Sequence, residues 1–508
     1  MFNAVDSSTT FLNVTPGKRQ LAQDPRQQIL DVRQDALAGC PAARNRINAL
    51  LDGGSFVEYG LLAGRTSDVD DDAPADGLVG GVGEVDAHPV VAASYDRTVH
   101  KGTQSERNQR KLAKLIYLAM TNRWPLIIFA DGEGARRDDP LPPPPIVNPT
   151  RARWDVYDGL AELSGWAPTV AVVSGRALDA TAGLAFLCDF VIGVVGSTIG
   201  GSAGDQVTER PVEDYAARGE IDLLVEDEQA AVAAARRYVS FWTTTTVGLG
   251  EPSPSHEKIG SIVPDNRRQP YDMRKLLTAF ADADSVMELG RSWAPSMVTS
   301  LARLGGRAIG IFANQPFSPR AGAIDSAAAD KAARFVELCD AYELPLVSFV
   351  DNPGYMVGPD AEAEGIARHH ARPLSAIHHR TVPLYAVQIR KAYGLGPYAM
   401  SGYGSSRSMP ELRLSWPSVE SGGMSLEGAA YLVKRKEIRS AASPKQARAI
   451  RDEYAAQMRD VASGVRAGRT YSFDDVVTPE ETRERILTMV HRTKRKLPDA
   501  KKHPIDPR

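Results

Sequence analysis

Two adjacent backbone amides near residue 395 could hold a negatively charged oxygen during a reaction. Residues 386–393 are predicted to be a buried strand that breaks at Gly394 and Gly396, and a helix is predicted to follow Pro397. Proline in the first helical turn loses only an N–H that would have no partner, and glycine lets another molecule approach the backbone. The amides of Leu395 and Gly396 are therefore predicted to form an oxyanion site at the positive end of a helix.

A second copy of this strand, turn and helix lies earlier in the chain. Residues 168–181 align without a gap on residues 383–396, which sets Asp179, Ala180 and Thr181 against Gly394, Leu395 and Gly396. One such turn would be weak support for chemistry, because many α/β proteins contain turns of this kind that bind nothing. Its repetition favours a functional role.

The repeat extends beyond the two turns. Residues 87–92 align with 306–311, and residues 129–135 align with 349–355, each pair about 220 residues apart. Three elements in the same order indicate a duplicated domain. Strands alternate with helices in both halves, which predicts the α/β class with mixed sheets flanked by helices. The predicted boundaries are an N-terminal arm (1–42), a first domain (43–262) and a second domain (263–508).

Composition bounds the class of protein. The 508 residues are 43% apolar and 24% charged, which is ordinary for a globular protein with two domains. A net charge of −3 gives no sign of nucleic-acid binding. Cys40, Cys188 and Cys339 lie far apart, which argues against a disulfide framework or a zinc ribbon. Without a long apolar run or a signal peptide, we expect a cytoplasmic protein with no membrane or nucleic-acid partner.

Several segments are predicted to lie on the surface. Residues 68–76 are an acidic loop, residues 138–145 a stiff proline-rich loop, and residues 197–204 a glycine-rich loop. The basic residues 494–496 and 501–503 could meet phosphate groups, but a solvated tail is favoured.

Six short stretches make the chain recognisable by their order and spacing. They are residues 51–58, 313–316, 330–336, 345–354, 365–369 and 390–394. Between about residues 43 and 504 the chain resembles the carboxyltransferase (β) subunit of biotin-dependent acyl-CoA carboxylases. Each half of that family is a crotonase-like domain, so the resemblance implies two tandem β-β-α superhelix domains of the ClpP/crotonase type.

The resemblance also implies the ligands and the partners. The first domain would hold an acyl-CoA and the second carboxybiotin, with the site between the first domain of one subunit and the second domain of its partner. A dimer is the minimum, and a hexamer, of this chain alone or mixed with a paralogue, is expected. Because the sequence has no biotinyl segment and no ATP-binding region, biotin carboxylase and the biotin carboxyl carrier would be separate polypeptides. No bound metal is expected.

The chemistry of this family needs two sites for negative charge. An enolate forms at the thioester, and the ureido oxygen of biotin becomes charged when CO₂ leaves. The biotin nitrogen can remove the α-proton, so no side-chain base is required. Each preorganised donor could lower the barrier by about 3 to 4 kcal/mol.

The resemblance assigns roles to specific residues. Leu395 and Gly396 would form the biotin-side oxyanion hole, and Asp179 and Ala180 the thioester-side hole, by a match to the family's Ala-Gly-Gly-Ala turn. The negative charge of a carboxylate beside the enolate would disfavour formation of the enolate. The Asp179 side chain is therefore predicted to turn away as a helix N-cap. The residues expected around the substrates are Gly134, Ala135, Arg136, Pro353, Gly354, Gly394 and Tyr398.

Some alternatives stay open at the level of sequence. His369 and His370 favour a structural or interface role over a metal site, because adjacent helical side chains diverge. Arg390 and Lys391 could bind an anion or anchor the turn.

The favoured function is carboxyl transfer from carboxybiotin to the α-carbon of an acyl-CoA, in fatty acid metabolism. The alternatives are an acyl-CoA decarboxylase or biotin-independent carboxyltransferase on the same fold, and a catalytically silent scaffold beside an active paralogue.

Overall fold

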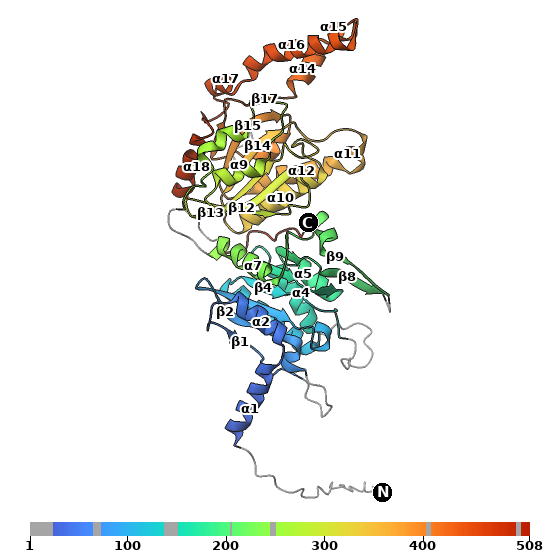
Figure 1. The fold of residues 1–508 in the computed structure, drawn as a ribbon, viewed down its shortest axis with the longest axis vertical. Helices are drawn as coiled ribbons and strands as arrows, with labels where there is room; N and C mark the ends of the chain where they lie inside the picture. Colours follow the sequence, from blue (N-terminus) through green and yellow to red (C-terminus); the bar gives the residue numbers. More distant parts are fainter. Residues whose placement is uncertain are drawn as a thin grey trace, which may run out of the picture.

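The computed structural model describes residues 24–64, 73–136, 151–203, 206–243, 250–402, 408–493 and 499–507. They form two bodies, each built on its own sheet (Figure 1). Helix α1 (Pro25–Ala38) extends from one end, and helices α14 (Leu426–Val433) to α17 (Gly464–Arg469) extend from the other. The predicted proline-rich loop 138–145 and the basic residues 494–496 lie outside the described residues, so both stay predictions.

The first body contains a sheet in the spatial order β1-β2-β3-β4-β5-β7-β10. β1, β2 and β3 pair antiparallel, and the later neighbours pair parallel. Its strands are β1 (Val57–Glu58), β2 (Leu78–Val85), β3 (His88–Tyr95), β4 (Leu126–Phe129), β5 (Thr169–Val173), β7 (Phe190–Val194) and β10 (Leu223–Val225). Its helices are α2 (Pro41–Leu50), α3 (Glu106–Asn122), α4 (Arg151–Leu163), α5 (Ala180–Phe186), α6 (Val212–Ala217) and α7 (Glu228–Thr243).

The second body repeats this plan in the order β11-β12-β13-β14-β15-β16-β18, with β17 beside β15. Its strands are β11 (Met287–Leu289), β12 (Met297–Leu304), β13 (Arg307–Asn314), β14 (Leu346–Asn352), β15 (Leu384–Tyr393), β16 (Leu412–Ser415), β17 (Glu420–Gly422) and β18 (Asp475–Val476). Its other helices are α8 (Ile259–Ile262), α9 (Met273–Phe280), α10 (Ser326–Ala341), α11 (Pro359–Ala363), α12 (Ile366–His379), α13 (Gly396–Ser401), α15 (Arg435–Arg439), α16 (Pro444–Ala462) and α18 (Glu481–Arg492).

The two sheets agree residue by residue with the alignment of the two halves. Leu126 in β4 pairs with Thr169 in β5, and the aligned residue Leu346 in β14 pairs with Leu384 in β15. A shift of one residue would turn every side chain to the opposite face, so this agreement is a strict test. The predicted duplication and the α/β class are confirmed.

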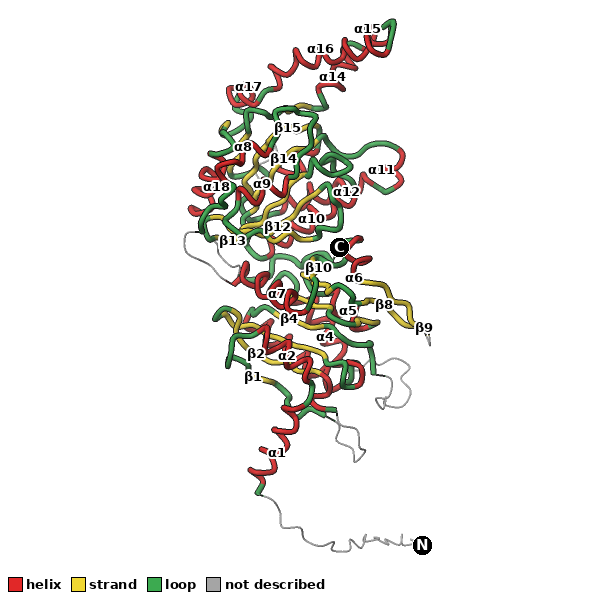
Figure 2. The backbone as a smooth tube through the Cα atoms, viewed as in Figure 1, coloured by secondary structure: helices red, strands yellow, loops and turns green. Residues whose placement is uncertain are grey.

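One predicted loop is a hairpin instead. Residues 198–203 form β8 (Thr198–Ala203), which pairs antiparallel with β9 (Gln206–Pro211) and parallel with β6 (Arg176–Leu178). The hairpin projects from the first body (Figure 2). The prediction failed because glycine usually breaks strands, whereas Gly200 is needed here: a Cβ on it would lie 2.0 Å from the carbonyl oxygen of Thr208.

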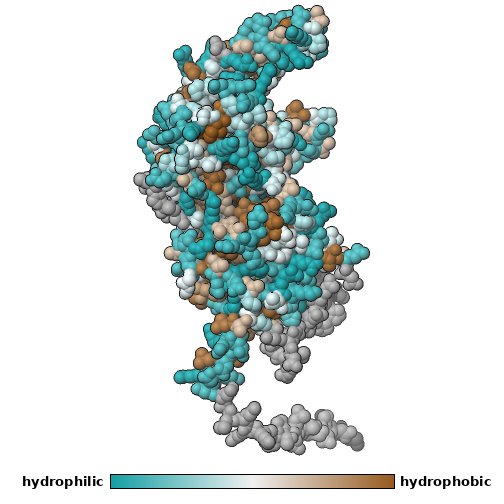
Figure 3. Space-filling view, viewed as in Figure 1, coloured by the Kyte–Doolittle hydropathy of each residue, from teal (hydrophilic) through white to brown (hydrophobic). Residues whose placement is uncertain are grey.

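A continuous core joins the two bodies. Four aromatic side chains follow one another across it: Phe190 and Tyr238 stack with ring centroids 4.1 Å apart, Tyr238 meets Trp242 at 5.3 Å, and Trp242 meets Tyr342 at 5.0 Å. Hydrophilic residues dominate the face shown in Figure 3, with small groups of hydrophobic residues between them. The aromatic contacts therefore bury apolar surface of both halves in a shared core.

Buried charges also connect the two bodies. Arg334 of α10 reaches across to the first body, where its Nη1 lies 3.0 Å from Asp222 Oδ1 and its Nη2 donates to the carbonyl oxygen of Asp189 at 2.7 Å. Burial raises the pKa of the Asp222 carboxyl, and the guanidinium opposes that rise. The arginine therefore compensates a carboxylate that would otherwise be costly to bury.

The C-terminal residues 501–503 are not a solvated tail. Lys501 Nζ donates to the carbonyl oxygen of Ala161 at 3.2 Å, and Lys502 Nζ donates to that of Asp340 at 2.8 Å. His503 Nε2 lies 3.2 Å from Asp340 Oδ2, and this hydrogen bond raises the pKa of His503. The prediction failed because the carbonyl and carboxylate partners come from distant parts of the chain.

We predict that Arg334→Met destabilises the protein by about 3–5 kcal/mol, because it leaves Asp222 buried without its cation. The midpoint of thermal unfolding should fall accordingly. Combining Arg334→Met with Asp222→Asn should recover part of the loss, since residue 222 then carries no buried charge. A single variant as stable as the wild type would contradict this role.

We predict that the contribution of His503 to stability depends on pH. Its folded-state pKa is raised, so its contribution is complete below its ordinary pKa of about 6.5 and is lost as pH rises through the folded-state pKa. The difference in unfolding midpoint between the wild type and His503→Gln should be larger at about pH 5.5 than at about pH 8.5. An equal or larger difference at the higher pH would contradict the assignment.

Candidate active site

The turn after β15 contains the two neighbouring amides that were predicted as donors. Gly394 has φ of 62°, and its N–H donates to the carbonyl oxygen of Gly422 at 3.0 Å. The next two residues, Leu395 and Gly396, open helix α13, and within the described part of the chain their N–H groups have no acceptor. This geometry agrees with the predicted pair of donors.

A buried carboxylate fixes this turn from below. Asp351 is fully buried at the end of β14; its Oδ1 accepts from the Lys391 amide at 3.2 Å, and its Oδ2 accepts from Arg390 Nε at 2.9 Å. The Arg390 guanidinium also lies over the Tyr271 ring at 4.7 Å. Of the two roles left open for Arg390, the structure therefore supports anchoring the turn rather than binding an anion.

The turn after β6 has the same arrangement one residue later than predicted. The Asp179 amide donates to the carbonyl oxygen of Gly200 at 2.9 Å, just as the aligned Gly394 amide donates to a neighbouring strand. The amides without an acceptor among the described residues are those of Ala180 and Thr181. The prediction that the Asp179 amide is available as a hole donor is wrong, and among the described residues the Thr181 amide is without an acceptor instead. The gapless alignment set Thr181 against Gly396 and could have found it.

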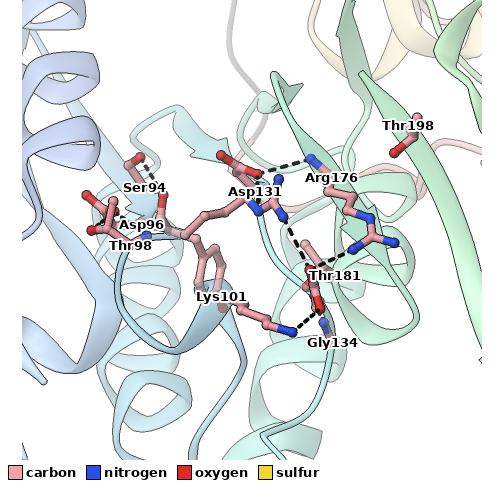
Figure 4. Close-up of polar contacts among 12 residues, drawn as sticks. Ser94, Asp96, Thr98, Lys101, Asp131, Gly134, Arg176, Thr181 and Thr198 are labelled. Carbon is pink, nitrogen blue, oxygen red and sulfur yellow. Dashed lines mark hydrogen bonds and ion pairs between the residues drawn. The ribbon is translucent and has the colours of Figure 1, made fainter. Parts of the chain in front are cut away.

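The carboxylate below the turn is repeated as well. Asp131, which aligns with Asp351, accepts from the Arg176 amide at 3.0 Å through Oδ1 (Figure 4). Its Oδ2 lies 3.0 Å from Nη2 of Arg46 in α2. The arginine comes from another element here because the residue aligned with Arg390 is Gly175, where a Cβ would lie 2.3 Å from Asp131 Oδ1.

The Asp179 side chain is not the predicted helix cap. It makes no capping hydrogen bond to α5; its carboxylate instead accepts from the Ser202 amide at 2.6 Å and from Ser202 Oγ at 2.5 Å. Asp179 has φ of 49° and ψ of −118°, which directs the side chain toward the β8–β9 hairpin. The carboxylate thus faces away from the start of α5, as expected, but through a different contact.

The loop at 134–136 lies against the first turn. The Gly134 amide donates to Thr181 Oγ1 at 3.3 Å, and the Ala135 side chain is exposed. Arg136 was expected to contact the substrate, but its buried guanidinium pairs with Asp76 Oδ1 at 2.6 Å. Arg136 therefore holds the loop. Asp76 is fully buried, which also corrects the prediction that it belongs to an exposed acidic loop; residues 68–72 lie outside the described residues.

Salt bridges connect this loop to the hairpin; Arg176 and Lys101, which take part in them, are labelled in Figure 4. Arg176 Nη1 lies 2.8 Å from Glu133 Oε1, and Arg176 Nη2 lies 2.8 Å from Glu209 Oε1 in β9. Hydrogen bonds from Arg176 lower the pKa of Glu209 to about 2. Lys101 Nζ approaches Glu133 Oε2 at 3.7 Å. Charged side chains held by salt bridges therefore lie around the turn after β6.

The corresponding loop in the second body lies against the second turn. The Gly354 amide donates to Asn352 Oδ1 at 2.6 Å, and the carbonyl oxygen of Gly354 accepts from the Ile324 amide at 3.1 Å. Pro353 between them is partly exposed. Tyr398 lies on α13 and is 36% exposed, so its ring can line a ligand site. Sequence reasoning missed Asn352, although the Asn-Pro-Gly order after a strand was a signal for a turn.

The two histidines of α12 have separate contacts. His369 Nδ1 lies 2.8 Å from Asp330 Oδ1, and the His370 ring centroid lies 3.7 Å from that of Tyr355. Within the described residues, no group of three or more His, Cys, Asp or Glu side chains is arranged to hold a metal ion. Nor does any described helix have the length and apolar character needed to cross a membrane.

Comparisons with known proteins identify the family of the chain. The family model for the carboxyl transferase domain matches residues 36–504. The chain is 33% identical over 495 residues to the methylmalonyl-CoA carboxyltransferase 12S subunit of Propionibacterium freudenreichii subsp. shermanii, covering 92% of this chain and 91% of the relative. It is 31% identical over 496 residues to the biotin-dependent long chain acyl-coenzyme A carboxylase beta4 subunit of Mycobacterium tuberculosis, covering 93% and 92%.

Solved structures share the fold. A chain of the transcarboxylase 12S hexamer, solved with methylmalonyl-coenzyme A and methylmalonic acid bound, superposes with a TM-score of 0.82 at 30% identity, covering 97% of this chain and 99% of that chain. A single-chain, multi-domain long-chain acyl-CoA carboxylase gives a TM-score of 0.83 at 34% identity over 91% of this chain. The present chain spans 48% of that longer protein. From the family match across both bodies and these relatives, the chain belongs to the carboxyl transferase domain family, which includes the β subunits of acyl-CoA carboxylases.

Proposed function

We propose that the chain is the carboxyltransferase subunit of an acyl-CoA carboxylase, moving a carboxyl group from carboxybiotin on a separate carrier protein to the α-carbon of an acyl-CoA. The observation that carries this proposal is the pair of equivalent turns, each with two adjacent amides that have no acceptor within the described residues. The family membership supports the same reaction.

The two turns suit the two charges of the reaction. The amides of Ala180 and Thr181 would bind the thioester oxygen as the enolate forms. Those of Leu395 and Gly396 would bind the ureido oxygen when CO₂ leaves biotin. Donors fixed by buried carboxylates need no rearrangement as charge develops, which is how such sites stabilise a transition state.

The domain roles follow from this assignment. Residues 43–262 would hold the acyl-CoA and residues 263–508 the biotin, with biotin carboxylase and the carrier as partner proteins. The two turns belong to different sheets, and we propose that they meet across the boundary between two copies of the chain. The hexameric assembly of the transcarboxylase 12S relative supports an oligomer of this kind.

Labelled bicarbonate separates this function from the two alternatives. With purified biotin carboxylase, carrier and ATP, label should enter a candidate acyl-CoA only when the chain is present. Release of CO₂ from a carboxylated CoA ester without biotin would instead indicate a decarboxylase. A chain that does neither, alone or with the partners, would be a silent scaffold.

We predict that Leu395→Pro lowers kcat by about 10²-fold, because proline lacks the N–H that would hold the ureido oxygen. Leu395 has φ of −78°, which proline can adopt, so the fold should survive. The matched control is Leu395→Ala, which changes a side chain that is 55% exposed and keeps the amide. Equal rates for the two folded variants would show that the second hole is misplaced.

We predict that Asp179→Gly changes kcat by less than about threefold. The carboxylate is held by Ser202, away from the amides of Ala180 and Thr181, and glycine readily adopts a φ of 49°. A rise of tenfold or more in steady-state rate would mean that the carboxylate opposes the enolate, and would favour the silent-scaffold alternative for the wild type.

A further inference from the structure

Each half of the protein has a loop glycine whose amide donates to a side chain, and the two side chains differ. Gly134 and Gly354 occupy aligned positions in the loops beside the two turns. The Gly134 amide donates to Thr181 Oγ1 at 3.3 Å, whereas the Gly354 amide donates to Asn352 Oδ1 at 2.6 Å. The same anchoring contact is therefore made from two different places in the chain.

In each half, the position that holds the anchoring side chain is aligned with a glycine in the other half. The residue aligned with Asn352 is Gly132, and the residue aligned with Thr181 is Gly396. A Cβ on Gly396 would lie 2.6 Å from Asn352 Oδ1 and 2.7 Å from its Nδ2. The Asn352 carboxamide therefore lies directly against the Gly396 backbone, and only glycine at residue 396 leaves room for it.

In the second half, the anchoring Asn352 side chain also carries an NH₂ group, which has no acceptor among the described residues. Because the Gly354 N–H must meet an oxygen, the carboxamide orientation is fixed, and Nδ2 is the other atom of the group. Asn352 is fully buried, and its Nδ2 has no acceptor in the part of the chain that the structure describes. A threonine hydroxyl in the first half does the anchoring without adding such an NH₂ group. A buried donor left unpaired is costly, which points to an acceptor supplied by a ligand.

We infer that Asn352 Nδ2 is a third hydrogen-bond donor to the ureido oxygen of biotin, beside the amides of Leu395 and Gly396. This inference rests on the proposed function. When the N–C bond of carboxybiotin breaks, CO₂ leaves and its bonding electron pair stays on the ureido group, whose nitrogen then takes the α-proton of the acyl-CoA. A third donor stabilises that anion on the biotin side only.

The test uses the chain alone, with methylmalonyl-CoA as carboxyl donor and free biotin as acceptor. Asn352→Asp keeps an oxygen for the Gly354 amide and removes the NH₂ group. We expect its kcat at about pH 8 to fall about 10²-fold, with the KM for methylmalonyl-CoA unchanged. Burial raises the pKa of a carboxyl, so the deficit should shrink toward about pH 5.5, where a protonated carboxyl can donate.

A double variant transplants the arrangement of the first half. Asn352→Gly with Gly396→Thr supplies a threonine hydroxyl for the Gly354 amide, keeps both turn amides and removes the third donor. We expect the same loss of kcat as in Asn352→Asp, without recovery at low pH. Asn352→Leu, which removes both the anchor and the donor, should also lower the midpoint of thermal unfolding.

The outcomes distinguish the inference from the function on which it rests. If the wild type carboxylates biotin and the folded double variant or Asn352→Asp matches its rate across the pH range, Asn352 only anchors Gly354 and the inference is overturned alone. If the wild type neither carboxylates biotin nor binds it by calorimetry, the proposed function and the inference fail together.

Discussion

A buried aspartate beneath each turn is the contact on which the proposed active site depends. Asp131 and Asp351 follow aligned strands, and each accepts the amide of the residue three positions before its turn while its other oxygen meets an arginine. A buried carboxylate without these partners would be costly. The contact therefore fixes the strand, and with it the direction of the turn amides that follow.

Both halves have the buried aspartate, but the residues that contact it differ between them. Asp351 takes its arginine from the adjoining strand as Arg390, whereas Asp131 takes Arg46 from a helix at the start of the first body. The anchoring of the loop glycine diverged in the same way, through Thr181 in one half and Asn352 in the other. A duplicated fold can thus present two similar pairs of amides to two chemically different anions.

Much of the fold could be predicted because the signals were local or repeated. Hydrophobic strands separated by helices indicated the α/β class, and aligned residues such as Leu126 and Leu346 gave the same strand register in both halves. The β8–β9 hairpin and the docked residues 501–503 could not be predicted, because glycine in a strand and charge in a tail become favourable only through partners distant in sequence.

The duplication, the family and the placement of Leu395 and Gly396 at a turn could all be read from the order of residues along the chain. Which amides remain unpaired depends instead on how distant segments pack together. The Asp179 amide donates to the carbonyl oxygen of Gly200, and Arg136 pairs with Asp76, so neither group is available to a ligand. Both contacts join segments far apart in the chain. Whether a polar group is free for a ligand depends on every neighbour in space, and local sequence does not contain that information.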